Sequence, residues 1–229
     1  MVGGAWRRLL ATEESPMDVR FGSLSLVLGL LCVSPAAAHP HVWVTVGSEV
    51  LFSRDGKIMG LRHTWMFDEM YSAYAVQGLG KDGKPPTREE LAPVVKTNVE
   101  ALAEAEYFTL AKQGNVELKF KNPVDATLEV DQEKIVTLRF TLPLETPVAA
   151  QKPFSFEVYD PTYYIAFELK KQNPVTMARA PSGCSLSLVE PQSPAAAETQ
   201  KMTEAFFQSL SPGAFFGIKF ATRVNVICR

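Results

Sequence analysis

Apolar and polar residues alternate over six short segments after residue 115. Successive side chains of a strand point to opposite faces, so a period of two indicates strands with one buried face. Earlier, residues 41–52 and 58–67 are rich in β-branched and apolar residues, with the hairpin turn signal Asp55-Gly56 between them. The later apolar positions are Val116, Leu118 and Phe120; Val136, Leu138, Phe140 and Leu142; Phe154, Phe156 and Val158; Ile165, Phe167 and Leu169; Cys184, Leu186 and Leu188; Val224, Val226 and Cys228. These segments predict antiparallel strands.

One long helix is predicted between the hairpin and the later strands. The sequence at 87–90, Thr-Arg-Glu-Glu, has the form of a capping box, and helical spacing of apolar residues continues over 91–107. Pro93 lies deep within a helix that starts at that cap. We therefore expect the first turn to begin nearer Glu89 or Glu90.

Two shorter helical patterns complete the secondary structure. Residues 68–77, directly after the hairpin, are typical of a short helix, and residues 198–210 have an amphipathic pattern. The fold class expected from all these segments is α+β. It is mainly antiparallel β-sheet, with a helical excursion after the first hairpin and a C-terminal helix.

The start of the chain has the layout of a secretory signal. If Met17 is the real initiator, a basic residue precedes an apolar run over 21–33, and an Ala-x-Ala cleavage site follows. The apolar run is too short to span a bilayer. We therefore expect a signal peptide over 1–38 and a single exported, periplasmic α+β domain over 39–229.

Composition excludes several protein classes. The chain has 229 residues, 46% of them hydrophobic and 21% charged, which is ordinary for a globular protein and argues against disorder. The formal net charge is −2, and no basic cluster suggests nucleic acid as a partner. No apolar run reaches the roughly 18–20 residues of a transmembrane helix, so no integral membrane segment is expected in the mature protein.

Two cysteines, Cys184 and Cys228, remain in the part expected to be exported. An even number of cysteines in an exported chain suggests a disulfide, here one that ties the C-terminal strand to the body of the domain. The sequence has no Cys-x-x-Cys motif, so we expect a structural bridge and no thiol redox chemistry.

Histidines are the candidate metal ligands. After cleavage, His39 and His41 would be the first and third residues of the mature chain. An N-terminal histidine offers its α-amine and its imidazole, and residues i and i+2 of an extended segment point to the same face. Pro40 has no amide hydrogen and so cannot supply the deprotonated backbone nitrogen of a square-planar amino-terminal site. Nitrogen donors of this kind favour Cu, Ni, Zn or Co.

A third histidine, His63, lies in the second predicted strand. Pairing across the hairpin turn places it opposite roughly position 47, short of the N-terminus, so convergence with the other histidines requires a bulge or an uneven hairpin. Asp68 is a candidate carboxylate ligand, and Glu69 is a candidate for orienting an imidazole. The alternative is a frayed, non-functional N-terminus and a His63 that is simply hydrogen bonded within its strand.

Two further turns carry carboxylates. Residues 78–89 share only part of the pattern of a calcium loop, because Gly78 and Gly80 occupy the first two ligand positions, so we do not expect calcium. Asp160, in an aromatic turn, is expected to accept backbone hydrogen bonds in an Asx-turn. A supporting role beside the metal is the alternative for Asp160.

Six blocks in the same order make residues 39–229 resemble one bacterial family. The blocks are His39-Pro-His-Val-Trp43, His63-Thr-Trp-Met-Phe-Asp-Glu69, Tyr71-Ser-Ala73, Arg88-Glu-Glu-Leu-Ala-Pro93, Tyr159-Asp-Pro-Thr-Tyr163 and Gly183-Cys184. The family is an uncharacterised exported one labelled a periplasmic component of an ABC-type transport system, often encoded beside nickel/cobalt-type permeases. The resemblance implies handling of a divalent metal, with a membrane metal permease or ABC transporter subunits as partners. It also carries over His39, His41 and His63 as candidate ligands.

The expected function is therefore that of a periplasmic accessory protein that binds Ni, Co, Zn or Cu and works with a membrane metal transporter. The chain lacks the repeated βαβ pattern of a two-lobed solute receptor. A carrier is favoured over an enzyme, but two alternatives stay open. One is a copper oxidoreductase that uses an N-terminal histidine brace, and the other is a structural or partner-docking module without metal.

Overall fold

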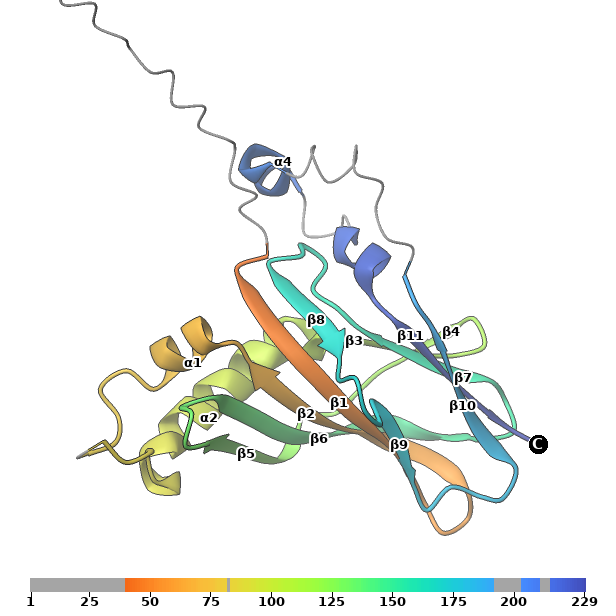
Figure 1. Ribbon diagram of the computed structural model, residues 1–229. Helices are drawn as coiled ribbons and strands as arrows, with labels where there is room; N and C mark the ends of the chain where they lie inside the picture. The colour runs from red at the N-terminus through yellow and green to blue at the C-terminus, as the bar shows by residue number, and fades with distance from the viewer. Residues whose placement is uncertain (1–39, 82, 192–202, 211–214) are drawn as a thin grey trace, which may run out of the picture. The chain divides into compact units, whose positions relative to one another are not determined.

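Two β-sheets face each other in the computed structural model (Figure 1), which describes residues 40–81, 83–191, 203–210 and 215–229. The first sheet has the strand order β5-β6-β2-β1-β8, with β9 also beside β1, and the second has the order β10-β11-β7-β3-β4. The first sheet contains β1 (Val42–Phe52), β2 (Lys57–Phe67), β5 (Val124–Val130), β6 (Val136–Ala149), β8 (Ile165–Leu169) and β9 (Val175–Ala178). The second contains β3 (Thr109–Gln113), β4 (Val116–Leu118), β7 (Phe154–Val158), β10 (Cys184–Val189) and β11 (Arg223–Cys228). The mainly antiparallel α+β fold is confirmed.

The predicted first hairpin is present. Strands β1 and β2 pair in antiparallel fashion across the turn at Asp55-Gly56, and Gly56 has a φ of 77°, which favours glycine. His63 pairs with Ser48, one residue from the position expected. The hairpin therefore follows from the turn signal and the apolar pattern alone.

The expectation of an antiparallel strand is wrong for β8. Both β8 and β9 pair with β1 in parallel, and they follow one another along the same edge of that strand. The physical reason is that β8 and β9 come back to β1 after a long crossover, and the direction of such a pairing is not encoded in the period of either strand. Strands β3, β5 and β9 were not expected from the sequence.

The long helix α2 (Arg88–Glu104) begins where its cap predicts. The Thr87 side chain accepts from the Glu90 amide, and the Glu90 carboxylate accepts from the Thr87 amide at 2.8 Å, which completes the capping box. The expected later start at Glu89 or Glu90 is wrong. The helix instead keeps the exposed Pro93 inside it, where the ring removes one backbone hydrogen bond.

Helices α1 (Glu69–Ala75) and α4 (Glu204–Gln208) and the 3₁₀ turns η1 (Glu106–Phe108) and η2 (Phe216–Phe220) complete the described structure. Helix α4 begins after the Thr203 cap and confirms a C-terminal helix. Residues 198–202 of the predicted helix lie outside the described residues, as does the whole predicted signal peptide. No helix in the described ranges is long and apolar enough to cross a membrane.

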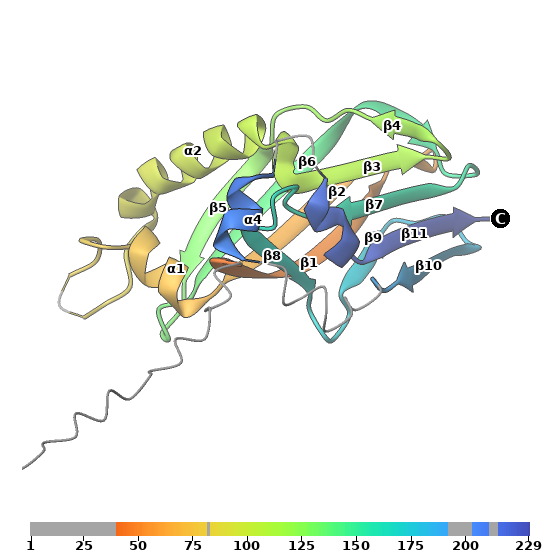
Figure 2. The ribbon, with the colours of Figure 1, turned by 90° about the horizontal axis from the view of Figure 1, so that it is seen from above.

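The core lies between the two sheets. Its largest fully buried side chains are Trp65 and Phe140 from the first sheet, and Phe154 and Phe156 from the second. Helix α2 lies over β5 (Figure 2), and its buried leucines join the same core. Burial of this apolar surface is the main favourable contribution to folding.

The predicted disulfide is present. Cys184 of β10 and Cys228 of β11 are direct partners in the antiparallel register, and their sulfurs are bonded. Because β10 is the edge strand of the second sheet, the bridge fastens both the C-terminus and that edge.

Candidate functional site

His63 lies in the centre of the core. Its side chain is 0% exposed, and its Nδ1 is 2.9 Å from Ser48 Oγ. The rings of Trp65, Phe140 and Phe156 surround it at centroid distances of 5.8, 5.3 and 6.3 Å. The sequence held a signal for this position, because His63 is in phase with the apolar Leu61 and Trp65 of the same strand.

The surroundings of His63 keep it neutral. Burial lowers its pKa from 6.5 to about 3. Its Nε2 has no hydrogen-bond partner among the described residues. A transition metal on that nitrogen would need further N, O or S donors, whereas the neighbouring rings of Trp65, Phe140 and Phe156 are not among the usual metal ligands. The structure therefore places His63 in a packing role.

The structure does not bring His63 and His41 together. His41 precedes Ser48, the partner of His63, by seven residues along an extended strand, which is about 23 Å. The bulge in this hairpin lies between Leu51 and Phe52, at the turn end, so it does not shorten that distance. His41 and His63 therefore do not belong to one site, and His39, which the hypothesis combined with either of them, lies outside the described residues.

His41 is exposed and directly precedes β1, in phase with the exposed Trp43 of that strand. Its amide donates to Tyr164 O at 2.9 Å, and its ring lies 4.7 Å from the Tyr164 ring. Tyr164 directly precedes β8, so the parallel pairing of β8 with β1 is what holds these two residues side by side.

Asp68 connects α1 to β1 at the same end of the sheet as His41. Its Oδ1 accepts from the Tyr71 amide at 2.9 Å, as the N-cap of α1, and its Oδ2 accepts from the Trp43 amide at 2.8 Å. The Asp68 amide in turn donates to Trp43 O. Asp68 therefore has a clear structural role, and the neighbouring Glu69 is exposed in the first turn of the helix.

Asp160 forms the Asx-turn expected from the sequence. Its Oδ1 accepts from the amide and hydroxyl of Thr162 at 2.8 and 2.9 Å, and its Oδ2 accepts from the Ile165 amide at 2.9 Å. The side chain is buried. A Cβ on Gly217 of η2 would overlap the backbone carbonyl of Asp160, so only glycine allows η2 to approach this turn.

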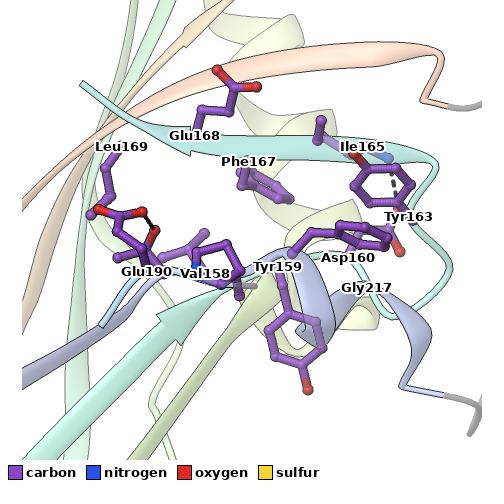
Figure 3. A pocket seen from close by; sticks show the side chains of 15 residues that line it. Val158, Tyr159, Asp160, Tyr163, Ile165, Phe167, Glu168, Leu169, Glu190 and Gly217 are labelled. Atoms are coloured by element: carbon purple, nitrogen blue, oxygen red, sulfur yellow. Dashed lines mark hydrogen bonds between the residues drawn. The ribbon is translucent and has the colours of Figure 1, made fainter. Parts of the chain in front are cut away.

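A cavity of about 370 Å³ lies beside the Asp160 turn (Figure 3). Its walls come from β8 of the first sheet and from the end of β7, the end of β10 and η2 around the second sheet. The described residues that line it include three acidic ones, Asp160, Glu168 and Glu190, and no lysine or arginine. Sequence reasoning identified Asp160 but not the cavity, because the cavity forms only when the two sheets meet.

A second cavity, of about 250 Å³, lies beside η1 and includes three glutamates in its lining. The three residues of η1 are consecutive and left-handed, with φ values of 47°, 59° and 48° for Glu106, Tyr107 and Phe108. Such a run costs roughly 1–2 kcal/mol per residue. No pattern in the sequence predicts this left-handed run.

Within the described ranges, no three His, Cys, Asp or Glu side chains gather closely enough to hold a metal ion. A metal centre with three or more such ligands that includes His41 would therefore draw at least part of them from outside the described ranges, where His39 lies.

Comparison with known proteins identifies a family without an assigned activity. An uncharacterised protein of Haemophilus influenzae is 24% identical over 211 residues, which cover 89% of this chain and 98% of that protein. Residues 24–228 match the family described as "Protein of unknown function (DUF1007)". This match spans nearly the whole chain, and the protein belongs to the DUF1007 family.

Proposed function

We propose that this protein is an exported accessory protein that binds a divalent transition metal at its mature N-terminus and exchanges it with a membrane metal transporter. The observation that carries the proposal is the contrast between the two described histidines. His63 is enclosed in the core, whereas His41 offers an exposed imidazole at the very start of β1.

The donors at this end of the sheet suit the metals expected from the sequence. Signal cleavage before His39 would add an α-amine and a second imidazole two residues from His41, and nitrogen donors favour Ni, Co, Zn or Cu. Asp68 lies at the same end, and a carboxylate that accepts two backbone hydrogen bonds still has lone pairs for a cation or an imidazole. The exposed Glu69 is a further carboxylate beside it.

The fold supports an accessory role. Two facing sheets with helix α2 over one of them give no pair of lobes, within the described part of the chain, that could close around a solute as a transport receptor would. The partners proposed are accordingly a membrane metal permease or ABC transporter subunits, with the protein presenting a surface-bound ion to them in the periplasm.

A calorimetric metal titration tests the proposal. Cu(II), Ni(II), Co(II) and Zn(II) are titrated into exported protein whose N-terminus at His39 has been verified by mass spectrometry. The same titrations use protein with one additional N-terminal glycine and a His41→Ala variant. We expect at least about a tenfold loss of affinity in both altered forms, because loss of even an outer partner of a metal site costs 10–100-fold.

His63→Gln is the matched control. It also removes an imidazole, but one that lies in the core, so the folded variant should keep the full affinity. Binding that survives the glycine extension and His41→Ala but is lost in folded His63→Gln would contradict the assignment. Absence of binding for all four metals would remove the proposed function.

A further inference from the structure

We propose that the outer edge of β8, which no described strand covers, docks an extended segment of a partner protein as an added β-strand beside the cavity. The segment would carry alternating apolar and basic residues. This inference does not depend on the metal site, because it rests on a different part of the molecule.

Strand β8 has a hydrogen-bonding edge that no described strand covers. It is the last strand of the first sheet and, among the described strands, pairs with β1 alone. The Val42 amide donates to Tyr164 O, and the Lys170 amide donates to Val46 O, so the even-numbered residues of this segment face β1. Backbone N–H and C=O groups alternate in direction along a strand. The N–H and C=O groups of Phe167 and Leu169 therefore point to the edge away from β1.

Ile165, another odd-numbered residue of β8, confirms that these residues direct their amides away from β1. Its amide donates away from β1, to Asp160 Oδ2. Further along the same edge, the N–H and C=O groups of Phe167 and Leu169 are available to an incoming chain. Added strands bind through such main-chain groups.

The side chains of β8 define what the incoming strand needs on each face. Ile165, Phe167 and Leu169 line the cavity between the sheets, opposite Val158 and Phe220. In Figure 3, Glu168 points away from the side on which Phe167 and Leu169 lie. An added strand in register would therefore place apolar side chains in the cavity and its other side chains beside Glu168.

Charge selects a basic segment. Glu168 is exposed, and no ion pair joins Glu168 or Glu190 to the described residues. Two exposed lysines, Lys170 and Lys171, follow β8, and Lys170 extends over Gly47 of β1, with its Cδ and Cε 3.4 Å from the position of a Cβ there. Lys170 thus lies toward β1, and the open edge presents the carboxylate of Glu168.

The other edge strands differ from β8, and β9, which among the described strands also pairs with β1 alone, has only four residues and no charged side chain. Strand β5 has a bulge between Val124 and Thr127 and a left-handed Asp125, and β4 is only three residues long. Bulges and short strands are common defences against unwanted pairing. Strand β10 exposes Leu188 and Val189, but its sequence has no charge that could select a partner.

Peptide titration followed by amide exchange tests the proposal. The probe is the blocked heptapeptide Lys-Val-Lys-Val-Lys-Val-Lys, compared with its counterpart in which glutamate replaces lysine. Binding is measured by fluorescence anisotropy and exchange by NMR. We expect saturable binding of the basic peptide and slower exchange of the Phe167 and Leu169 amides, with the β10 amides unchanged.

Two variants make the test specific. Leu169→Pro removes an edge-facing donor without touching the ladder to β1, so the folded variant should lose the peptide. Glu168→Lys should weaken binding of the basic peptide about tenfold and favour the acidic one, since cross-strand charges attract or repel according to sign. Glu133→Lys, in the β5–β6 turn, makes the same charge change elsewhere and should have no effect.

Three results would overturn the proposal. They are absence of saturable binding, protection that appears in β10 in place of β8, and a dimer of the peptide-free protein in sedimentation that protects the Phe167 and Leu169 amides. The last result would mean that a second copy of the chain occupies the edge.

Discussion

His63 is a titratable side chain held entirely inside the core, and this couples its protonation to stability. The unfolded chain binds a proton at His63 near the ordinary histidine pKa of 6.5, whereas burial lowers the pKa in the folded state to about 3. As the pH falls below 6.5, His63 binds a proton in the unfolded state but stays neutral in the folded state. Stability is therefore fully present above that pH and is lost progressively as the pH falls toward 3, by about 5 kcal/mol in all.

A double variant isolates this contribution. Ser48→Ala with His63→Leu replaces both buried hydrogen-bonding partners with apolar groups, which can be nearly neutral for stability. We expect the double variant to lose up to about 1.4 kcal/mol per pH unit of the acid dependence between about pH 6 and 4, measured by urea denaturation. Ser48→Ala alone should keep the slope of the parent protein. An equal slope in all three proteins would show that His63 is protonated in the folded state.

Gly217 is fixed by a backbone contact. A methyl group there would overlap the carbonyl of Asp160, and a backbone atom cannot move aside as a flexible side chain can. We expect Gly217→Ala to destabilise the protein by about 1–3 kcal/mol in chemical denaturation, the usual cost of overpacking. Gly47→Ala is the control, since its new Cβ would meet only the flexible Lys170 side chain at 3.4 Å. Equal stability of both variants would mean that η2 shifts freely against the Asp160 turn.

At the scale of elements, the features predicted correctly are those that depend on a few neighbouring residues, such as turns and helix caps. The Asp55-Gly56 turn specified the hairpin, and the Thr87 capping box specified the start of α2. Strand β3 (Thr109–Gln113) has too few apolar residues to show a period, and its stability comes from its neighbours β4 and β7. The parallel pairing of β8 and β9 depends on contacts with β1 more than a hundred residues earlier, which no local window contains.

The left-handed turn η1 gives an element-scale prediction. Glu106 has a φ of 47°, a conformation that glycine adopts without steric cost. We expect Glu106→Gly to raise the free energy of unfolding by up to about 1 kcal/mol. Glu104→Gly, two residues earlier at the end of α2, should lower it by up to about 1 kcal/mol, because glycine is a poor helix former. A loss of stability in both variants would show that the Glu106 side chain makes contacts that outweigh its backbone strain.

For the whole molecule, the architecture was more predictable from the sequence than the site was. Apolar periods and turn residues sufficed for the α+β class, and two cysteines sufficed for the bridge. The candidate ligands were chosen by residue type, and type alone did not reveal that His63 faces inward while His41 faces solvent. The cavity beside β8 depends on how two sheets meet, so it was beyond any argument from spacing.

The disulfide links the last residues of the chain to the edge of the second sheet, so its loss affects the molecule as a whole. The bridge closes a loop with a sequence separation of 44 residues, which corresponds to about 3–4 kcal/mol in the chain-entropy model. We expect reduction, or replacement of Cys184 and Cys228 by serine, to lower the free energy of unfolding by that amount in urea titrations. β11 is the one described strand that pairs with β10, so the β10 amides should exchange faster in the reduced protein. The amides of β2 and β6, at the centre of the first sheet, should lose protection only through global unfolding. An unchanged midpoint after verified reduction would contradict this account and would mean that pairing with β7 and β10 is sufficient to hold the C-terminal strand.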